Sequence, residues 1–280
     1  RAAFDLASRV LGCDVAVLCA ADADPAALND TRNAQAAIAT LSIGIGRALE
    51  ARGVRPDALV GFSLGQVSAL ALGGMVSDED ALRIVAERSR IMGEVADANP
   101  GAMTALLKGT AAEAEEACAA CAQGEVLVAA NYNSPAQTVV AGTPAAIERV
   151  EQAWKARGGR ASRLATSGAF HSPLMQPACE PFAAFLDTIG FAEPDVPIIG
   201  NADARPLQAA TIRDQMVAHL VSPVRFTDSI ALLAGAGATT FAEVGFGGVL
   251  SGLVKRCAPD AERACIQDAA SLEAFVEGRS

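Results

Sequence analysis

Residues 58–68 read ALVGFSLGQVS and place a lone serine, Ser63, between two glycines directly after a run of apolar residues. Ala58 to Val60 has the composition of a short buried strand, and the apolar spacing after the second glycine is typical of a helix. The pentapeptide from Gly61 to Gly65 has the G-x-S-x-G spacing of a nucleophile elbow, where a sharp turn from strand to helix exposes the serine oxygen.

Both glycines are expected to be required, because a side chain two residues before or after the serine would clash inside so tight a turn. The alternative is an ordinary turn from a strand into a helix, with a small polar residue as the N-cap. The pentapeptide alone leaves both interpretations open, so the rest of the chain has to distinguish them.

The composition of the 280 residues restricts the class of protein. Apolar residues make up 51% of the chain and aromatic residues only 4%, so the core is expected to consist of Ala, Leu, Val and Ile. A net charge of −10 argues against nucleic acid as a partner, because such binding requires a basic face. No apolar run approaches the roughly 20 residues of a membrane span. The first ten residues lack the apolar region of a signal peptide.

The cysteines indicate a reducing compartment. There are seven of them, an odd number without a disulfide-like pattern, which is typical of the cytoplasm. Cys118 and Cys121 form a single CxxC with no second pair and no nearby histidine. They are expected to be ordinary helix residues, and no metal site is expected.

The order of the predicted elements indicates an α/β domain, residues 1–100 and 166–280, that a smaller domain interrupts. Residues 101–165 predict the order β-α-β-β-α-β, which is the ferredoxin-like arrangement. A cleft between two such domains is a natural place for a substrate. The elements predicted for the larger domain are helices Asn29–Arg52, Glu79–Val95, Pro173–Ile189, Ile212–Leu220 and Thr227–Ala236 and strands Ala58–Val60, Val196–Gly200 and Thr240–Val244.

A serine nucleophile needs a base, and the chain holds only two histidines. His219 lies in a helical stretch, where a structural role is the default interpretation. His171 lies in the loop SGAFHSPLM, after the last strand of the smaller domain, and a loop at a domain junction can direct a base into a cleft. No Asp near a strand end completes a triad, but a backbone carbonyl can orient an imidazole instead.

Arg88 is the third candidate and lies in the predicted helix after the elbow helix, within ALRIVAERSRIM. An arginine near a serine nucleophile could bind a substrate carboxylate through two hydrogen bonds. The alternative, which the spacing alone favours, is a surface arginine paired with Glu87 or Glu94.

Seven blocks occur in a fixed order along nearly the whole chain: GFSLGQVSALALGGMVS, ALRIVAERSRIM, GAM, NYNSPAQTVVAG, GAFHSPLM, SPVRF and EVGFGGVLSGLVKR. Together they resemble the malonyl-CoA:acyl carrier protein transacylase family, relatives of the acyltransferase domains of polyketide synthases. Seven ordered blocks are far more specific than one pentapeptide. The resemblance implies an α/β-hydrolase-like core with an inserted ferredoxin-like subdomain, which agrees with the two predicted domains.

The resemblance also implies roles for individual residues. Ser63 would be the acylated nucleophile, His171 its general base, and Arg88 the arginine that holds the malonyl carboxylate. The Leu64 N–H would be an oxyanion donor. The backbone carbonyl of His219 would orient the catalytic histidine, which leaves the His219 side chain without a required role. Three further residues would lie near the pocket: Gln35, Asn133 and Asn201.

Several residues depart from the family pattern. The family's elbow usually has His before the serine and Glu after the second glycine, where this chain has Phe62 and Gln66, and activity is expected to survive both changes. The segment Gly168–His171 resembles the HAFH tetrapeptide that accompanies malonyl use in polyketide acyltransferases, with glycine in place of the first histidine. Phe170 is expected to fill the space of a methyl group on C2 of the substrate.

The opening residues RAAFDLASRV do not match the family's Gly-Gln-Gly-x-Gln loop, whose glutamine N–H is half of the oxyanion hole. The sequence therefore predicts a truncated start that leaves only the Leu64 N–H for the oxyanion. Loss of one such donor typically costs about 10²–10³ in rate.

The sequence thus predicts transfer of malonyl from malonyl-CoA to the phosphopantetheine thiol of acyl carrier protein, through a malonyl-serine ester, for fatty acid synthesis. No cofactor is expected. The predicted protein is a cytoplasmic monomer that binds neither nucleic acid nor membranes. Three alternatives stay open: an acyltransferase domain of a polyketide synthase, a catalytically impaired module that binds carrier protein, and a serine esterase that would not need Arg88.

Overall fold

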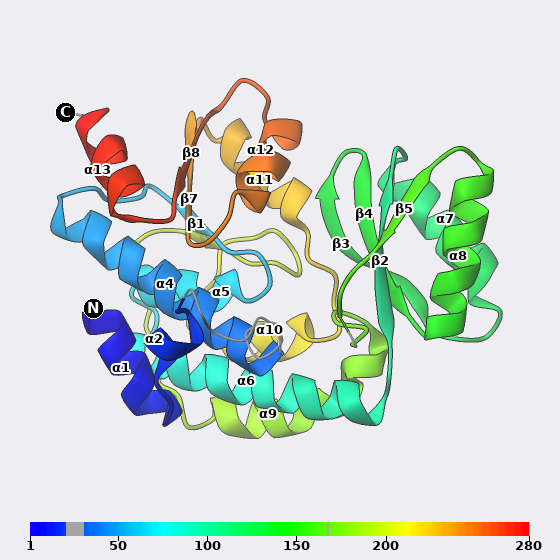
Figure 1. The fold of residues 1–280 in the computed structure, drawn as a ribbon, viewed down its shortest axis with the longest axis horizontal. Coiled ribbons are helices and arrows are strands. Elements are labelled where there is room, and N and C mark those ends of the chain that lie inside the picture. The colour runs from blue at the N-terminus through cyan, green and yellow to red at the C-terminus, as the bar shows by residue number, and fades with distance from the viewer. Residues whose placement is uncertain (21–30, 167, 280) are drawn as a thin grey trace.

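The elbow stretch joins a strand to a helix in the computed structural model, which describes residues 1–20, 31–166 and 168–279 (Figure 1). Strand β1 (Leu59–Val60) ends before the serine turn, and helix α5 (Gly65–Leu72) starts two residues after the serine. β1 pairs in parallel with β6 (Ile198–Ile199). The predicted strand-turn-helix order is confirmed, with a strand one residue shorter than expected.

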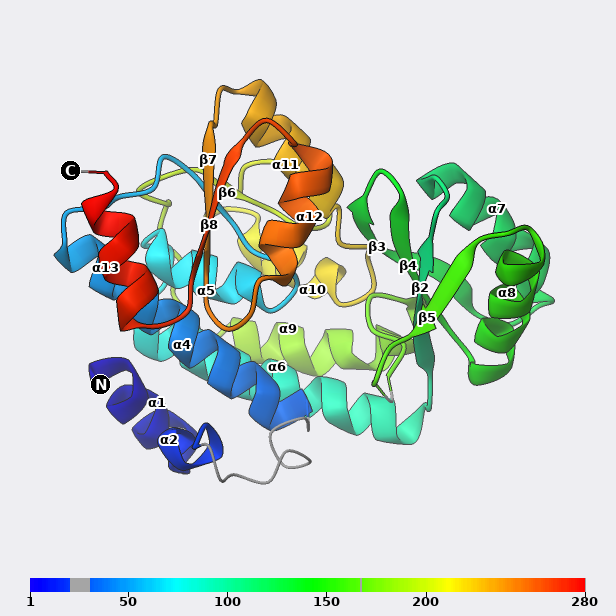
Figure 2. The same ribbon diagram turned by 45° about the horizontal axis from the view of Figure 1, so that its top comes forward.

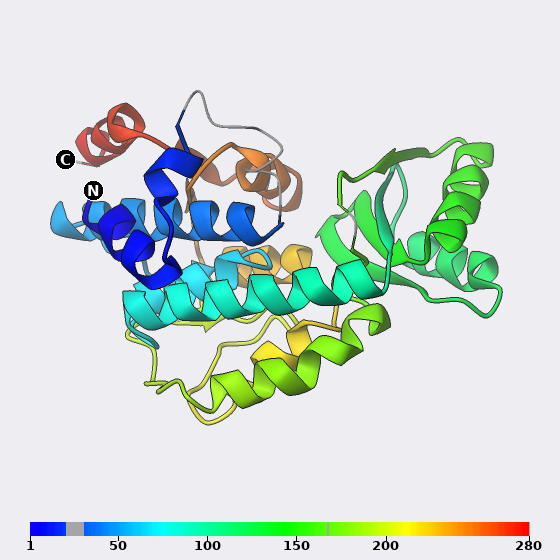
Figure 3. The same cartoon turned by 60° about the horizontal axis from the view of Figure 1, so that its bottom comes forward.

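The larger part of the molecule contains a second parallel pair, β7 (Thr240–Val244) with β8 (Glu262–Ile266). Helix α6 runs from this part toward the smaller one, and α4 lies beside it (Figure 3). Residues 29 and 30, where the sequence predicted the start of α4, lie outside the described residues. Besides α5, the described residues of this part form the α-helices α1 (Ala2–Leu11), α2 (Val15–Leu18), α4 (Thr31–Ala51), α6 (Asp78–Ala98), α9 (Cys179–Leu186), α10 (Ile212–His219), α11 (Phe226–Gly235), α12 (Val249–Cys257) and α13 (Ala269–Glu277).

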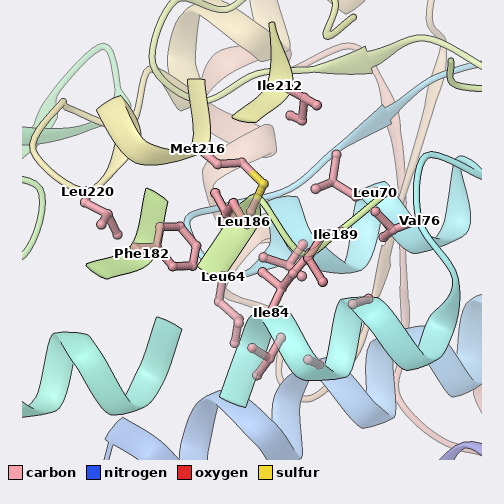
Figure 4. Close-up of a cluster of buried hydrophobic side chains, with 14 of the residues drawn as sticks. Leu64, Leu70, Val76, Ile84, Phe182, Leu186, Ile189, Ile212, Met216 and Leu220 are labelled. Atoms are coloured by element: carbon pink, nitrogen blue, oxygen red, sulfur yellow. The ribbon is translucent and has the colours of Figure 1, made fainter. Parts of the chain in front are cut away.

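The main hydrophobic core lies among α5, α6, α9 and α10 (Figure 4). Leu70 of α5, Ile84 of α6, Phe182 of α9 and Met216 of α10 are all buried there. Burial of each such side chain contributes about 1.5–3 kcal/mol to the free energy of unfolding. The core therefore fixes α6 and α10 against the elbow helix, and side chains that leave these helices near the serine have defined positions.

The smaller part has the chain order β-α-β-β-α-β and a single antiparallel sheet with strand order β3-β4-β2-β5 (Figure 2). Trp154 is buried and donates from Nε1 to the Leu107 carbonyl at 2.9 Å. Cys118 and Cys121 are buried in the same core. The elements are β2 (Ala102–Leu107), α7 (Ala111–Ala122), β3 (Leu127–Ser134), β4 (Gln137–Gly142), α8 (Pro144–Ala156) and β5 (Arg160–Arg163).

One predicted helix is divided in the structure. Residues 173–189 were expected to form a single helix, but the first six form the 3₁₀-helix η1 (Pro173–Ala178) and α9 follows. Pro177 lies inside this segment, and a proline cannot donate the backbone hydrogen bond of an α-helix. None of the helices in the described residues is both long and apolar enough to span a lipid bilayer.

Candidate active site

Ser63 has a left-handed backbone conformation, with φ of 50°, at the turn between β1 and α5. This conformation is strained for a residue with a side chain. Gly61 is required here, because a Cβ atom on it would lie 2.0 Å from the backbone carbon of Gly65. A Cβ atom on Gly65 would meet no heavy atom within 4 Å. The prediction that both glycines are required is therefore wrong for Gly65, where α5 has begun and the side-chain direction is open.

Asn201 fixes the elbow by three hydrogen bonds. Its Oδ1 accepts from the Ser63 N–H at 2.6 Å, and its Nδ2 donates to the Gly61 carbonyl at 2.7 Å. Its own backbone N–H donates to Oε1 of Gln66 at 2.8 Å. Asn201 is thus beside the serine, as the sequence predicted, and its side chain holds the turn. Gln66 has a structural partner that the sequence pattern did not reveal.

Ser63 and His171 are within hydrogen-bonding distance, with 2.8 Å between the serine Oγ and the histidine Nε2. On the other side of the ring, Nδ1 of His171 lies 2.9 Å from the backbone carbonyl of His219 and donates to it. This contact leaves the lone pair of Nε2 facing the serine hydroxyl. A carbonyl thus takes the place of the acid of a triad, one of the arrangements that the sequence left open.

Both histidines are buried, and this controls their charge. Burial, followed by the charge of Arg88, lowers the pKa of His171 from near 6.5 to about 4, against the opposing effect of the carbonyls of His219 and Ser222. Burial also lowers the pKa of His219 well below its ordinary value, with smaller effects from the charges of His171 and Arg88. At neutral pH both rings are neutral, so His171 can accept a proton.

Arg88 is buried beside the serine rather than on the surface. Only 4% of it is exposed, its Nη2 donates to Ser63 Oγ at 3.0 Å, and its Nη1 donates to Oε1 of Gln35 at 2.5 Å. No carboxylate of the described residues forms an ion pair with it. Burial lowers the pKa of the guanidinium to about 10, which leaves it charged at neutral pH. The interpretation of Arg88 as a surface arginine is wrong, and the ion pairs with Glu87 and Glu94 are formed by Arg90 instead.

Two of the remaining candidates adjoin the site along the chain, Leu64 beside the serine and Phe170 beside the histidine, and Asn133 lies on β3. Leu64 follows the serine, and its N–H has no acceptor within the described part of the chain. Asn133 is buried on β3, and its Oδ1 has no partner among the described residues. Phe170 is half-buried and packs against the main core and against a smaller cluster that contains Met103 and Val139. A Cβ atom on Gly168 would lie 2.7 Å from the Phe170 ring, so the glycine that departs from HAFH makes room for that ring.

The geometry is suited to covalent acyl transfer to a serine. It combines a strained hydroxyl, a neutral base at 2.8 Å and a fixed cation at 3.0 Å from the same oxygen. The described residues contain no cluster of three or more His, Cys, Asp or Glu side chains that could hold a metal ion.

Comparison with known protein families identifies the class of enzyme. Residues 8–272 match the acyl transferase domain family, so the chain is an acyltransferase by fold and sequence. The malonyl CoA-acyl carrier protein transacylase of Bacillus subtilis is 38% identical over 260 residues, which is 91% of this chain and 82% of that protein. The chain belongs to the malonyl CoA-acyl carrier protein transacylase family.

Solved structures agree with this assignment. An acyl carrier protein S-malonyltransferase from Vibrio cholerae is 36% identical, with a TM-score of 0.94 over 98% of this chain and 90% of that one. A malonyl-transacylase solved in complex with its type II polyketide synthase acyl-carrier protein is 35% identical, with a TM-score of 0.95 over 99% of this chain and 90% of that one. At these identities the likeness extends from fold to family.

Proposed function

We propose that the protein transfers malonyl from malonyl-CoA to the phosphopantetheine thiol of acyl carrier protein through a malonyl ester of Ser63, and that it supplies fatty acid synthesis. One observation carries this proposal: the buried Arg88 guanidinium lies 3.0 Å from the serine oxygen without a carboxylate partner in the described residues. A buried cation without a counterion is unfavourable. A substrate with its own carboxylate, such as malonyl, supplies that counterion through charge-assisted hydrogen bonds.

The first half-reaction acylates the serine. Ser63 Oγ attacks the thioester carbonyl of malonyl-CoA while Nε2 of His171 takes its proton. The tetrahedral intermediate then expels the CoA sulfur, which receives the proton from the imidazolium. We assign the N–H of Leu64 to the developing oxyanion, since it directly follows the nucleophile and its hydrogen is unused within the described residues.

The second half-reaction reverses these roles for another thiol. The phosphopantetheine thiol of the carrier protein gives its proton to His171 and attacks the ester carbonyl. The C–O bond to Ser63 breaks, and the serine oxygen recovers the proton from the imidazolium. Every proton passes through one nitrogen, and the thioester bond energy is conserved, so the cycle as written requires no cofactor.

We assign residues 1–100 and 166–280 to an α/β-hydrolase-like core and residues 101–165 to a ferredoxin-like subdomain. The β-α-β-β-α-β order and the antiparallel sheet of residues 102–163 support the second assignment. The parallel pairs and the strand-serine-helix turn support the first.

All seven cysteines are free thiols, which supports a cytoplasmic location. We also propose that the protein is a monomer.

A transfer assay tests the proposed function. The protein is incubated with malonyl-CoA and phosphopantetheine-bearing acyl carrier protein, and the carrier is examined by mass spectrometry. We expect malonyl-carrier protein to accumulate. Hydrolysis of uncharged esters without any malonyl-carrier product would favour the esterase alternative. A preference for a polyketide carrier protein over a fatty acid carrier protein would favour the polyketide synthase alternative. This comparison is included because one relative was solved in complex with its type II polyketide synthase acyl-carrier protein.

Phe170 is proposed to exclude a methyl group on C2 of the acyl chain, since its ring lies next to the base in sequence and packs against Gly168. One excluded methyl group changes specificity by about 10- to 200-fold. We therefore expect malonyl-CoA to be preferred over methylmalonyl-CoA by this factor, and Phe170→Ser to narrow the ratio by admitting methylmalonyl-CoA. Competition between the two thioesters, with carrier products measured by mass, gives the ratio. Equal use of both by the wild type would remove this role from Phe170.

A further inference from the structure

His219 contacts His171 with two different groups. Its backbone carbonyl accepts from Nδ1 of His171 at 2.9 Å, and its imidazole stacks on the His171 ring with 4.7 Å between ring centroids and 28° between planes. His219 is the last residue of α10 and is 4% exposed. Any residue at this position would supply the carbonyl, whereas the stacking contact requires a flat ring.

The His219 ring is buried at a cost. Its Nε2 is inaccessible to solvent and has no hydrogen-bond partner among the described residues. Burial of a polar atom without a partner is unfavourable, and an aliphatic side chain would fill the same space without that penalty. A buried polar group of this kind requires an explanation, and the stacking contact with the base supplies one.

The hydrogen bonds of Nδ1 and Nε2 lie at opposite edges of the His171 ring, so together they leave the ring free to tilt about the line that joins them. A second ring packed on its face removes this freedom and sets the plane of the imidazole. The plane matters because Nε2 must stay aligned with Ser63 Oγ, which Arg88 also contacts. We propose that the His219 imidazole is a positioning group that keeps Nε2 of His171 directed at the Ser63 oxygen during both proton transfers. This inference rests on the proposed function of Ser63 and His171.

The charges around the two rings are compatible with this role. The titratable and charged groups that face them are the two imidazoles themselves and Arg88 from α6, and the carbonyls of His219 and Ser222 face His171. Burial, the His171 charge and the Arg88 charge keep the pKa of His219 well below its ordinary value. His219 therefore stays neutral when His171 becomes an imidazolium, and a neutral aromatic face can lie against that cation where a second cation would repel it.

Three variants separate the ring from its polar atom, and all of them keep the backbone carbonyl. His219→Ala removes the ring, His219→Phe keeps a flat ring without a polar atom, and His219→Gln keeps a polar atom without a ring. We expect His219→Ala and His219→Gln to slow serine malonylation about 10- to 100-fold, as for a misplaced catalytic group. The KM for malonyl-CoA should change little, and His219→Phe should recover most of the rate.

The pH dependence of kcat/KM distinguishes a positioning residue from a merely structural one, because loss of a structural residue would not shift it. The base acts only when neutral, so kcat/KM falls as the pH drops through the pKa of His171, which is about 4 in the wild type. Removal of the His219 ring relaxes the burial that lowers this pKa. In His219→Ala the acid limb should therefore move up toward the ordinary value near 6.5, and in His219→Phe it should stay low.

Nitrogen-15 NMR provides a second measurement that needs no activity. The chain has two histidines, so each His219 variant leaves one imidazole to observe. The Nδ1–H signal of His171 should be sharp in the wild type and in His219→Phe and broadened by exchange in His219→Ala. Met216→Ala, on the same helix, is the matched control: it should lower thermal stability without moving the acid limb.

Two results would overturn the inference: His219→Ala with an unchanged rate and acid limb, or His219→Gln active while His219→Phe is as slow as His219→Ala. The second result would show that the polar atom, not the stacked ring, is needed. Unfolding of His219→Ala leaves the Phe and Gln variants to decide. Failure of wild-type Ser63 to form any malonyl ester would instead contradict the proposed function, so the two failures are distinguishable.

Discussion

Ser63→Ala should form no malonyl adduct and should lose transfer to acyl carrier protein by a factor on the order of 10⁶, the loss expected when a covalent nucleophile is removed. The physical reason is the elbow, since the strained turn places this one hydroxyl 2.8 Å from Nε2 of His171. Intact-protein mass after incubation with malonyl-CoA measures the adduct, and mass analysis of the carrier protein measures the transfer.

Ser68→Ala is the matched control for this variant. Ser68 lies five residues further along, in α5, where its Oγ is buried without a partner in the described residues. Its removal should leave both adduct and transfer unchanged. An adduct of wild-type yield on Ser63→Ala would show that another nucleophile carries the acyl group, and the proposed cycle would then be wrong.

Arg88→Ala should lose malonyl transfer while it keeps or gains acetyl transfer. Only malonyl brings a carboxylate that pairs with the buried guanidinium, and removal of one partner of a buried ion pair costs about 3–5 kcal/mol, a loss of roughly 150- to 5,000-fold. Acetyl-CoA has no carboxylate, so it loses no ion pair when Arg88 is removed. In the variant it also no longer has to bind beside an unpaired buried cation. Rates of carrier-protein acylation from malonyl-CoA and from acetyl-CoA, measured side by side, give the two effects.

Arg90→Ala provides the control on the same helix. Arg90 is half-exposed and pairs with Glu87 and Glu94, so its loss should change neither rate by more than a small factor. Equal losses of malonyl and acetyl transfer in Arg88→Ala would show that Arg88 supports the fold or the serine, and not the choice of substrate.

The elbow and the base were predictable from the sequence because each has a local signal. G-x-S-x-G follows an apolar run, and His171 is one of only two histidines and lies in a loop between the predicted domains. The helical spacing favours burial of Arg88, which lies four residues after Ile84 and three after Val85 on the apolar face, but the neighbouring glutamates suggested a surface ion pair instead. The packing of α6 against the elbow shows that Arg88 is the buried arginine.

The errors have physical causes as well. Gly65 looked as necessary as Gly61, but the close approach is between the backbone of residues 65–66 and position 61, and a sequence pattern does not reveal which side of a turn is crowded. The links from Asn201 to Gly61, Ser63 and Gln66 join segments more than 130 residues apart, beyond any local pattern.

Ser63 is proposed to receive an acyl group that carries its own carboxylate. The most direct measurement offers wild-type protein equal amounts of malonyl-CoA and acetyl-CoA, stops the reaction before carrier protein is added, and locates each ester by peptide mass. We expect a malonyl ester on the peptide that contains Ser63, in large excess over acetyl. An acetyl ester in equal or greater amount, or a malonyl ester on any other residue, would contradict this role of Ser63 and Arg88.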